Sequence, residues 1–218
     1  MTKKSMSFVM ISAALAALGI LLAVLKIGFK FDVTSAASMN LTQLWLCMLA
    51  AVIFGLLYGF VRFDRANATA LAAATLHDLL LTFALSVLLS LVLPGLTQVP
   101  AANTLPAVLM LTVLCTYCQT MLVMRDARMT ARTTSRKDVS YEDAAKGAVA
   151  SSRPLRLRCL VMALLFAVAA AVGGGMGVLS VVAPLLLAMA VSYYSAENIT
   201  PYVWAACAAR MKVRKAYR

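Results

Sequence analysis

Long runs of apolar residues, separated by shorter polar segments, dominate the chain. Several of these runs are close to the roughly 20 residues that a helix needs to cross the ~30 Å hydrocarbon core of a membrane. A membrane barrel would instead alternate apolar and polar residues over roughly ten positions per strand. The pattern therefore predicts an all-α membrane protein, a bundle of six transmembrane helices. Their approximate bounds are residues 8–25, 44–61, 68–93, 105–124, 159–172 and 178–206.

The polar segments between the runs predict how the chain is organised. Residues 125–158 form the longest polar stretch, and we expect a cytoplasmic loop there. Residues 27–41 form a short polar segment that we expect on the outer side. The first apolar run follows two lysines, as in a signal peptide, but no clear small-residue cleavage site closes it, so we expect a retained helix. Residues 1–218 are predicted to form a single transmembrane domain.

Composition and charge agree with a lipid environment. Of the 218 residues, 63% are hydrophobic and only 13% are charged, against about 25% charged residues in soluble domains. With the amino terminus inside, 18 of the 20 Lys and Arg residues fall in inner segments, so the positive-inside rule predicts that both termini are cytoplasmic. The net charge of the chain is +12, and its basic residues are not interleaved with aromatic residues. We therefore expect the basic residues to contact anionic membrane lipids and not nucleic acid.

Three ionisable side chains fall where the hydrocarbon core is expected: His77, Asp78 and Glu197. A charge at mid-bilayer costs roughly 2.5–3.5 kcal/mol even on insertion scales, so these residues are candidate proton-relay groups. Asp78 lies about ten residues from the inner start of its helix, which is near mid-depth. A carboxyl group there can take up and release protons, as in membrane pumps. The alternative is that Asp78 only joins helices through hydrogen bonds.

The neighbouring polar residues allow further predictions. Adjacent helix positions point about 100° apart, so we expect His77 and Asp78 to find partners on other helices rather than each other. His77 is interpreted either as a packed histidine with one hydrogen-bond partner or as a relay group. Glu197 is expected either to pair with a positive group or to extend to the inner interface. Interhelical hydrogen bonds are expected from four residues of the fourth run, which are Thr116, Tyr117, Gln119 and Thr120.

The sequence contains no constellation typical of an enzyme. It has a single histidine, no nucleophile motif and no phosphate-binding glycine loop. Cys115 and Cys118 have the spacing of a redox or metal site, but they stand alone in an apolar run, so packing is the favoured interpretation. We predict no enzymatic activity, no cofactor and no bound metal.

Short motifs follow one another in a characteristic order over about two thirds of the chain. The third run contains the pair His77-Asp78, and the second run ends in Arg62-Phe63. In order and spacing, the motifs resemble the protein-export membrane protein family SecF. The matching segments are Tyr58–Phe63, Ala72–Thr82, Tyr117, Arg125–Arg128, Ser140–Ala144, Ser152–Arg153, glycines 173–175 and Val191–Ser195 followed by Pro201.

This resemblance implies a fold, partners and site residues. The fold would be one half of a resistance-nodulation-division transporter, with several passes through the bacterial inner membrane. The chain would be an accessory subunit of the Sec protein-translocation machinery that uses the proton gradient together with a SecD-like subunit beside the Sec channel. Asp78 would be the proton-relay residue, and Arg62, Arg128 and Arg153 would be anchors at the cytoplasmic face.

Two departures from the family pattern keep other functions open. The large extracytoplasmic domain of the family is reduced to residues 27–41, and the acid of its fourth helix is replaced in the segment Gln119-Thr120-Met121. One alternative is a small-molecule or proton transporter subunit of the same superfamily. The other is a non-transporting membrane scaffold that binds a cytoplasmic partner through residues 125–158.

Overall fold

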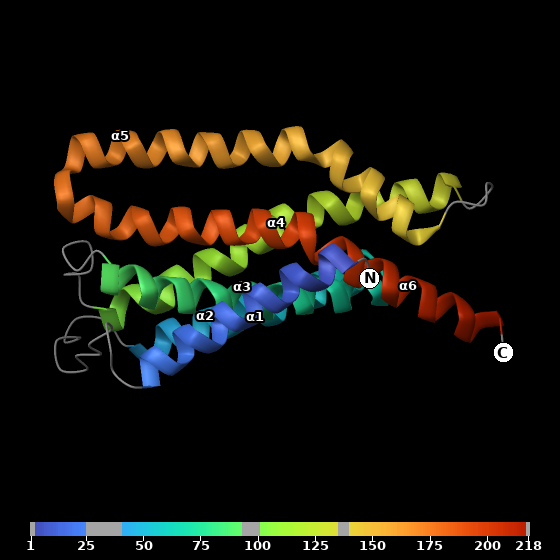
Figure 1. The fold of residues 1–218 in the computed structure, drawn as a ribbon, viewed down its shortest axis with the longest axis horizontal. Coiled ribbons are helices and arrows are strands. Elements are labelled where there is room, and N and C mark those ends of the chain that lie inside the picture. Colours follow the sequence, from blue (N-terminus) through green and yellow to red (C-terminus); the bar gives the residue numbers. More distant parts are fainter. Residues whose placement is uncertain (1–2, 25–40, 93–100, 135–139, 217–218) are drawn as a thin grey trace.

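The computed structural model describes residues 3–24, 41–92, 101–134 and 140–216, and in these ranges the chain is helical except at short joints. The prediction of an all-α fold is therefore confirmed. Figure 1 shows the longer helices running roughly side by side along the long axis of the molecule. The six helices are α1 (Lys3–Val24), α2 (Leu41–Arg62), α3 (Arg65–Val92), α4 (Ala101–Thr134), α5 (Tyr141–Asn198) and α6 (Thr200–Ala216).

Helix α5 is a hairpin rather than a rod. Its 58 residues would extend about 87 Å if they were straight. Figure 1 shows instead that α5 reverses direction at the end of the molecule away from both termini. Arg153 and Glu197 consequently form an ion pair, although they are 44 positions apart. We call the two halves the first arm and the return arm; they correspond to the predicted helices 159–172 and 178–206.

The predicted loop at residues 125–158 is wrong for most of its length. Helix α4 continues to Thr134, and α5 already begins at Tyr141. The start of α5 is capped by Ser140, whose hydroxyl accepts a hydrogen bond of 3.2 Å from the backbone N–H of Asp143. Several charged residues in this stretch, among them Arg125, Lys146 and Arg153, are exposed on continuing helices, so a polar composition did not indicate a loop.

The predicted end of the last membrane helix also needs correction. A single helix was expected over 178–206, but α5 ends at Asn198 and α6 begins at Thr200 after a break at Ile199. Pro201 lies in the first turn of α6, where its missing backbone N–H is tolerated. The residues after 206 are likewise helical, because α6 continues to Ala216.

Within the described ranges, three helices are long and apolar enough to cross a membrane, and the segments concerned are Trp45–Arg62, Arg65–Leu89 and Val108–Thr130. On α2 large apolar side chains point outward, among them Phe54 and Val61, which are 72% and 81% exposed. Such a surface is unfavourable in water and favourable in lipid. These features support a membrane protein; the short segment 27–41 lies almost wholly outside the described residues.

The best-packed region lies where α3, α4, both arms of α5 and α6 meet, and its core is rich in alanine. Small side chains allow helix backbones to approach closely, as is common between membrane helices. This alanine-rich cluster consists of Ala66, Ala70, Val123, Met124, Ala127, Ala144, Ala145, Ala148, Ala196, Trp204 and Ala205.

Candidate functional site

Asp78 is the central residue of the candidate site. It lies in the middle of α3, and its side chain is completely buried. The hydroxyl of Thr116 in α4 donates a hydrogen bond of 2.7 Å to its Oδ2 atom. The Nδ1 atom of His77 lies 2.9 Å from its Oδ1 atom. Both carboxylate oxygens therefore have a partner, as a buried acid requires.

A second hydroxyl extends this contact to α5. The Oγ1 atom of Thr116 lies 3.2 Å from Oγ of Ser192 in the return arm, and either atom can be the donor. The Ser192 hydroxyl also donates a hydrogen bond of 2.8 Å to the carbonyl oxygen of Ala188. Asp78, Thr116 and Ser192 thus form a buried polar line across three helices. Ser192 was not identified from the sequence; its spacing of three residues from Ser195 in an apolar run was the available signal.

His77 does not behave as predicted. The prediction that His77 and Asp78 would not pair is wrong, because Nδ1 of the imidazole lies 2.9 Å from the neighbouring carboxylate. The Cα–Cβ bonds of adjacent helix residues point about 100° apart, but rotation about the two χ angles of histidine brings its ring to the neighbouring carboxylate. Its ring also stacks on Tyr194 of the return arm, with ring centroids 6.4 Å apart. His77 therefore positions Asp78 on the side facing α5.

The other polar residues of α4 differ in their contacts. The hydroxyl of Tyr117 donates a hydrogen bond of 2.8 Å to the carbonyl oxygen of Val52 in α2. Its ring occupies the space next to Gly55, where a Cβ atom would overlap it. Gln119 and Thr120 are both buried, but Gln119 Oε1 and Thr120 Oγ1 have no partner among the described residues. The structure thus joins α2 and α4 through Tyr117.

Two of the three expected arginine anchors come together. Nη1 of Arg128 in α4 donates a hydrogen bond of 3.1 Å to the carbonyl oxygen of Arg62, the last residue of α2. A guanidinium at this position satisfies a carbonyl that the helix itself leaves free, and it complements the negative end of the helix dipole. We call the end of the bundle at which Arg62 and Arg128 lie the basic end.

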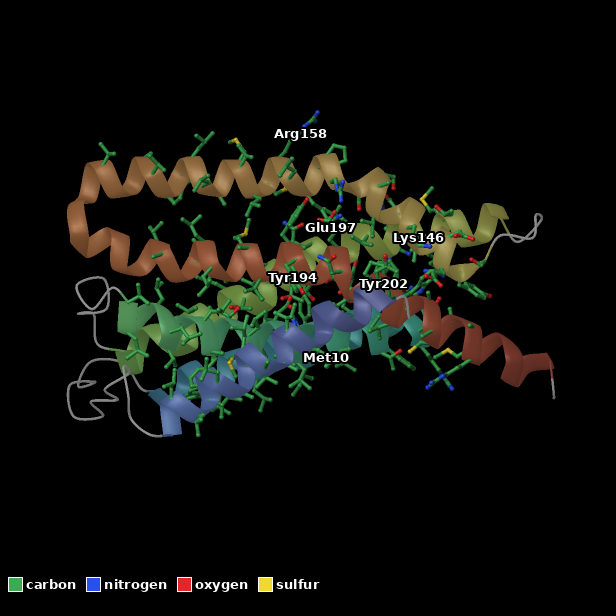
Figure 2. All side chains as sticks on the ribbon, viewed as in Figure 1. Met10, Lys146, Arg158, Tyr194, Glu197 and Tyr202 are labelled. Atoms are coloured by element: carbon green, nitrogen blue, oxygen red, sulfur yellow. The ribbon has the colours of Figure 1, made fainter. Side chains whose placement is uncertain are left out.

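Arg153 lies apart from that pair. Its guanidinium donates through Nε to Glu197 Oε1 at 2.8 Å, and through Nη2 to the same oxygen. The side chain of Arg153 is 59% exposed, whereas that of Glu197 is 15% exposed. Glu197 lies between the two arms of α5, and Arg158 points away from the bundle (Figure 2). Of the two alternatives predicted for Glu197, the structure thus shows pairing with a positive group, Arg153.

Arg156 is a buried cation that the sequence did not single out. It lies in the first arm, and its guanidinium carbon is 5.1 Å from the ring centroid of Tyr193 in the return arm. Its Nε donates a hydrogen bond of 3.2 Å to the hydroxyl of Ser152. Arg156 was one of nine basic residues in the stretch 125–158, so no feature of the sequence marked it for burial.

Neither metal ligands nor disulfides are found in the described part of the chain. Groups of three or more His, Cys, Asp or Glu side chains that could hold a metal ion do not occur there. All five cysteines are free, and Sγ of Cys115 lies 3.2 Å from Sδ of Met189. This contact joins α4 to the return arm of α5, as expected for a packing cysteine.

Comparison with protein-family models, with curated proteins and with solved structures finds no match to this chain. The fold and the site therefore define only a class: an all-helical protein with at least three helices suited to a membrane and a buried acid at their centre. Any narrower assignment has to be argued from the residues of the site.

Proposed function

We propose that the chain is a proton-coupled subunit of a membrane protein-translocation complex, in which Asp78 takes up and releases the proton. The observation that carries the proposal is the complete burial of a carboxyl group whose partners are the hydroxyl of Thr116 and the imidazole of His77. No Lys or Arg among the described residues forms an ion pair with it. In such surroundings ionisation is costly, so the neutral and the charged form can both be reached.

The hydrogen bonds around Asp78 support a two-state site. When the carboxyl group is ionised, the Thr116 hydroxyl donates to it, and Ser192 can donate in turn to Thr116. When the carboxyl group is protonated, its O–H can donate to Thr116, Thr116 to Ser192, and Ser192 to the Ala188 carbonyl. The line of hydroxyl groups can thus satisfy either protonation state by reversing its direction, which transmits the change to the return arm of α5.

The assignment to protein export is supported by the order of motifs that resembles the SecF family. In that family a six-helix unit works with a SecD-like subunit beside the Sec channel, and we extend this arrangement to the present chain. The basic end would then face the cytoplasm of a bacterial cell, in accordance with the positive-inside rule. Arg62 and Arg128 would hold α2 and α4 together at that face. Glu197, through its pair with Arg153, would join the arms of α5 and would not carry the proton.

The test is preprotein transport into inverted membrane vesicles, with and without a proton gradient. Asp78→Asn keeps the shape of the side chain and one oxygen that can accept the hydrogen bond of Thr116, but it cannot ionise. We expect it to abolish the stimulation by the gradient while membrane insertion and complex formation remain intact. Asp126→Asn is the matched control, since Asp126 accepts a hydrogen bond of 3.0 Å from Ser151 close to the basic end.

Unchanged stimulation in Asp78→Asn would refute the proton role and favour the interpretation that Asp78 only joins helices. Loss of stimulation in Asp126→Asn as well would point to a general effect of removing a charge. Recovery of a SecD-like subunit and the Sec channel with the tagged chain from native membranes would support the export assignment. Recovery of neither would favour a small-molecule transporter or a scaffold.

A further inference from the structure

Buried polar atoms without a hydrogen-bond partner are concentrated between Asp78 and the basic end. In the described part of the chain, these atoms belong to side chains that are at most 3% exposed. Each would cost about 1–3 kcal/mol if it stayed without a partner. On this side the atoms are Gln119 Oε1, Thr120 Oγ1, Thr200 Oγ1, both amide atoms of Asn67 and Trp204 Nε1. The other buried atoms without a partner are His77 Nε2 and Ser195 Oγ near the acid, Thr82 Oγ1 on its opposite side, and Nη1 of Arg156 in the first arm of α5.

These groups are spaced along the bundle axis. The contacts of Thr116 with Asp78 and Ser192 fix the relative heights of α3, α4 and the return arm. Counted along these helices at about 3.6 residues per turn, Thr120 lies about one turn from the acid and Asn67 about three turns. Thr200, the first residue of α6, follows the return arm after the break at Ile199. All three lie on the side of the basic end. They therefore form a line of polar groups that leads from Asp78 towards that end.

Among the described residues, no protein group is a partner for these atoms of Asn67 and Trp204. Trp204 belongs to the alanine-rich cluster, and Asn67 directly follows Ala66, another of its members. Apart from the indole nitrogen of Trp204, the side chains of this cluster carry no nitrogen or oxygen atom that could serve as a partner. Buried polar groups in proteins are nearly always satisfied, and where no side chain or backbone group serves, ordered water does. Bound water is therefore the ligand that fits these atoms.

Between Asp78 and the end of the bundle opposite to the basic end, the described polar side chains mostly bond to their own helix. The hydroxyl of Thr112 donates a hydrogen bond of 2.8 Å to the carbonyl oxygen of Val108 in its own helix. The hydroxyl of Ser86 likewise donates a hydrogen bond of 2.7 Å to the carbonyl oxygen of Thr82. Val87 and Val113 are completely buried there. Among the described residues on this side, Thr82 Oγ1 is the one buried side-chain atom without a partner. Among the described residues more than one helical turn from the acid on this side, the hydroxyl of Ser86 is bonded to its own helix, and Val87 is apolar.

From this asymmetry we infer that a file of bound water molecules connects Asp78 to the basic end of the bundle and not to the opposite end. The acid then exchanges its proton with the basic end in the conformation described. The inference deepens the proposed function and rests on it only in taking Asp78 as the proton site; the water file itself is independent of protein export.

The test measures access of a small hydrated cation to single thiols. In the full-length chain with all five cysteines replaced by alanine, Thr120→Cys places a thiol in the proposed file. Thr112→Cys is the matched control, because it lies about two turns away on the same helix and beyond the acid. Silver ions, which are small and bind thiols, are added to one face of membrane vesicles in chloride-free buffer. Thiols left free are then labelled after denaturation.

We expect silver added at the basic end to block the thiol of Thr120→Cys about tenfold faster than that of Thr112→Cys, as hydration of one site and not the other requires. Equal rates, or faster blocking from the opposite face, would overturn the inference. If Thr120→Cys does not yield a monodisperse protein, Thr200→Cys takes its place in the same comparison. Fast blocking together with unchanged export in Asp78→Asn would leave the water file standing and remove the proposed function.

Discussion

The hydroxyl of Thr116 donates a hydrogen bond of 2.7 Å to the carboxylate of Asp78, and so joins two helices through residues 38 positions apart. Ser192 extends the contact to a third helix over 3.2 Å. The acid is thus held in place by groups that can also follow a change in its protonation. The same hydrogen bonds serve the stability of the bundle and the chemistry of the site.

Removing the hydroxyl of Thr116 tests this double role. Thr116→Val keeps the branched shape of the side chain but leaves a buried carboxyl oxygen without its partner. We expect a loss of about 1–2 kcal/mol in the free energy of unfolding, the cost typical of an unsatisfied buried group. Thermal unfolding of the purified protein in detergent measures it.

Thr112→Val is the control for that experiment. Its hydroxyl bonds only to a carbonyl of its own helix, so the change should stay within about 0.5 kcal/mol. Equal losses in both variants would show that the contact between Thr116 and Asp78 contributes nothing specific.

The close approach of α2 and α4 depends on a glycine. A Cβ atom at Gly55 would overlap the ring of Tyr117, which bonds to the backbone of α2. Gly55→Ala should therefore separate the two helices and destabilise the protein by about 1–3 kcal/mol, as overpacking does. Thermal unfolding is again the measurement.

Gly147→Ala is the matched control, because nothing lies within 4 Å of the added atom. In a helix interior this change should stabilise by roughly 0.5–1 kcal/mol, since glycine is the poorer helix former. A neutral result for Gly55→Ala would mean that the ring of Tyr117 does not occupy this space.

The ion pair between Arg153 and Glu197 closes the two arms of α5. Because the arginine is largely exposed, Glu197→Gln should cost only about 0.2–1 kcal/mol at low ionic strength, and less at high salt. The stimulation of export by the proton gradient should persist in this variant. Its loss, with stability unchanged, would return Glu197 to the set of proton-relay residues.

The sequence predicted the helical fold and the central acid because both follow from the cost of polar groups in hydrocarbon. It did not predict that residues 125–134 and 141–158 are helical, because helices that leave the membrane carry charged residues as loops do. The alanines at 144, 145 and 148 were the available sign of a packed face there. The contact between His77 and Asp78 depends on side-chain torsions, and the burial of Arg156 depends on the reversal of α5; neither can be deduced from spacing along the chain.

The most direct test of the account is infrared spectroscopy of the purified protein during a pH titration, because the carboxyl C=O stretch reports whether an acid is protonated. We predict that one component of the carboxyl band, which appears and disappears reversibly with pH in the unmodified protein and in Asp126→Asn, is missing in Asp78→Asn, whereas the components of the other seven acids remain. A band that persists unchanged in Asp78→Asn would contradict the claim that Asp78 carries the proton.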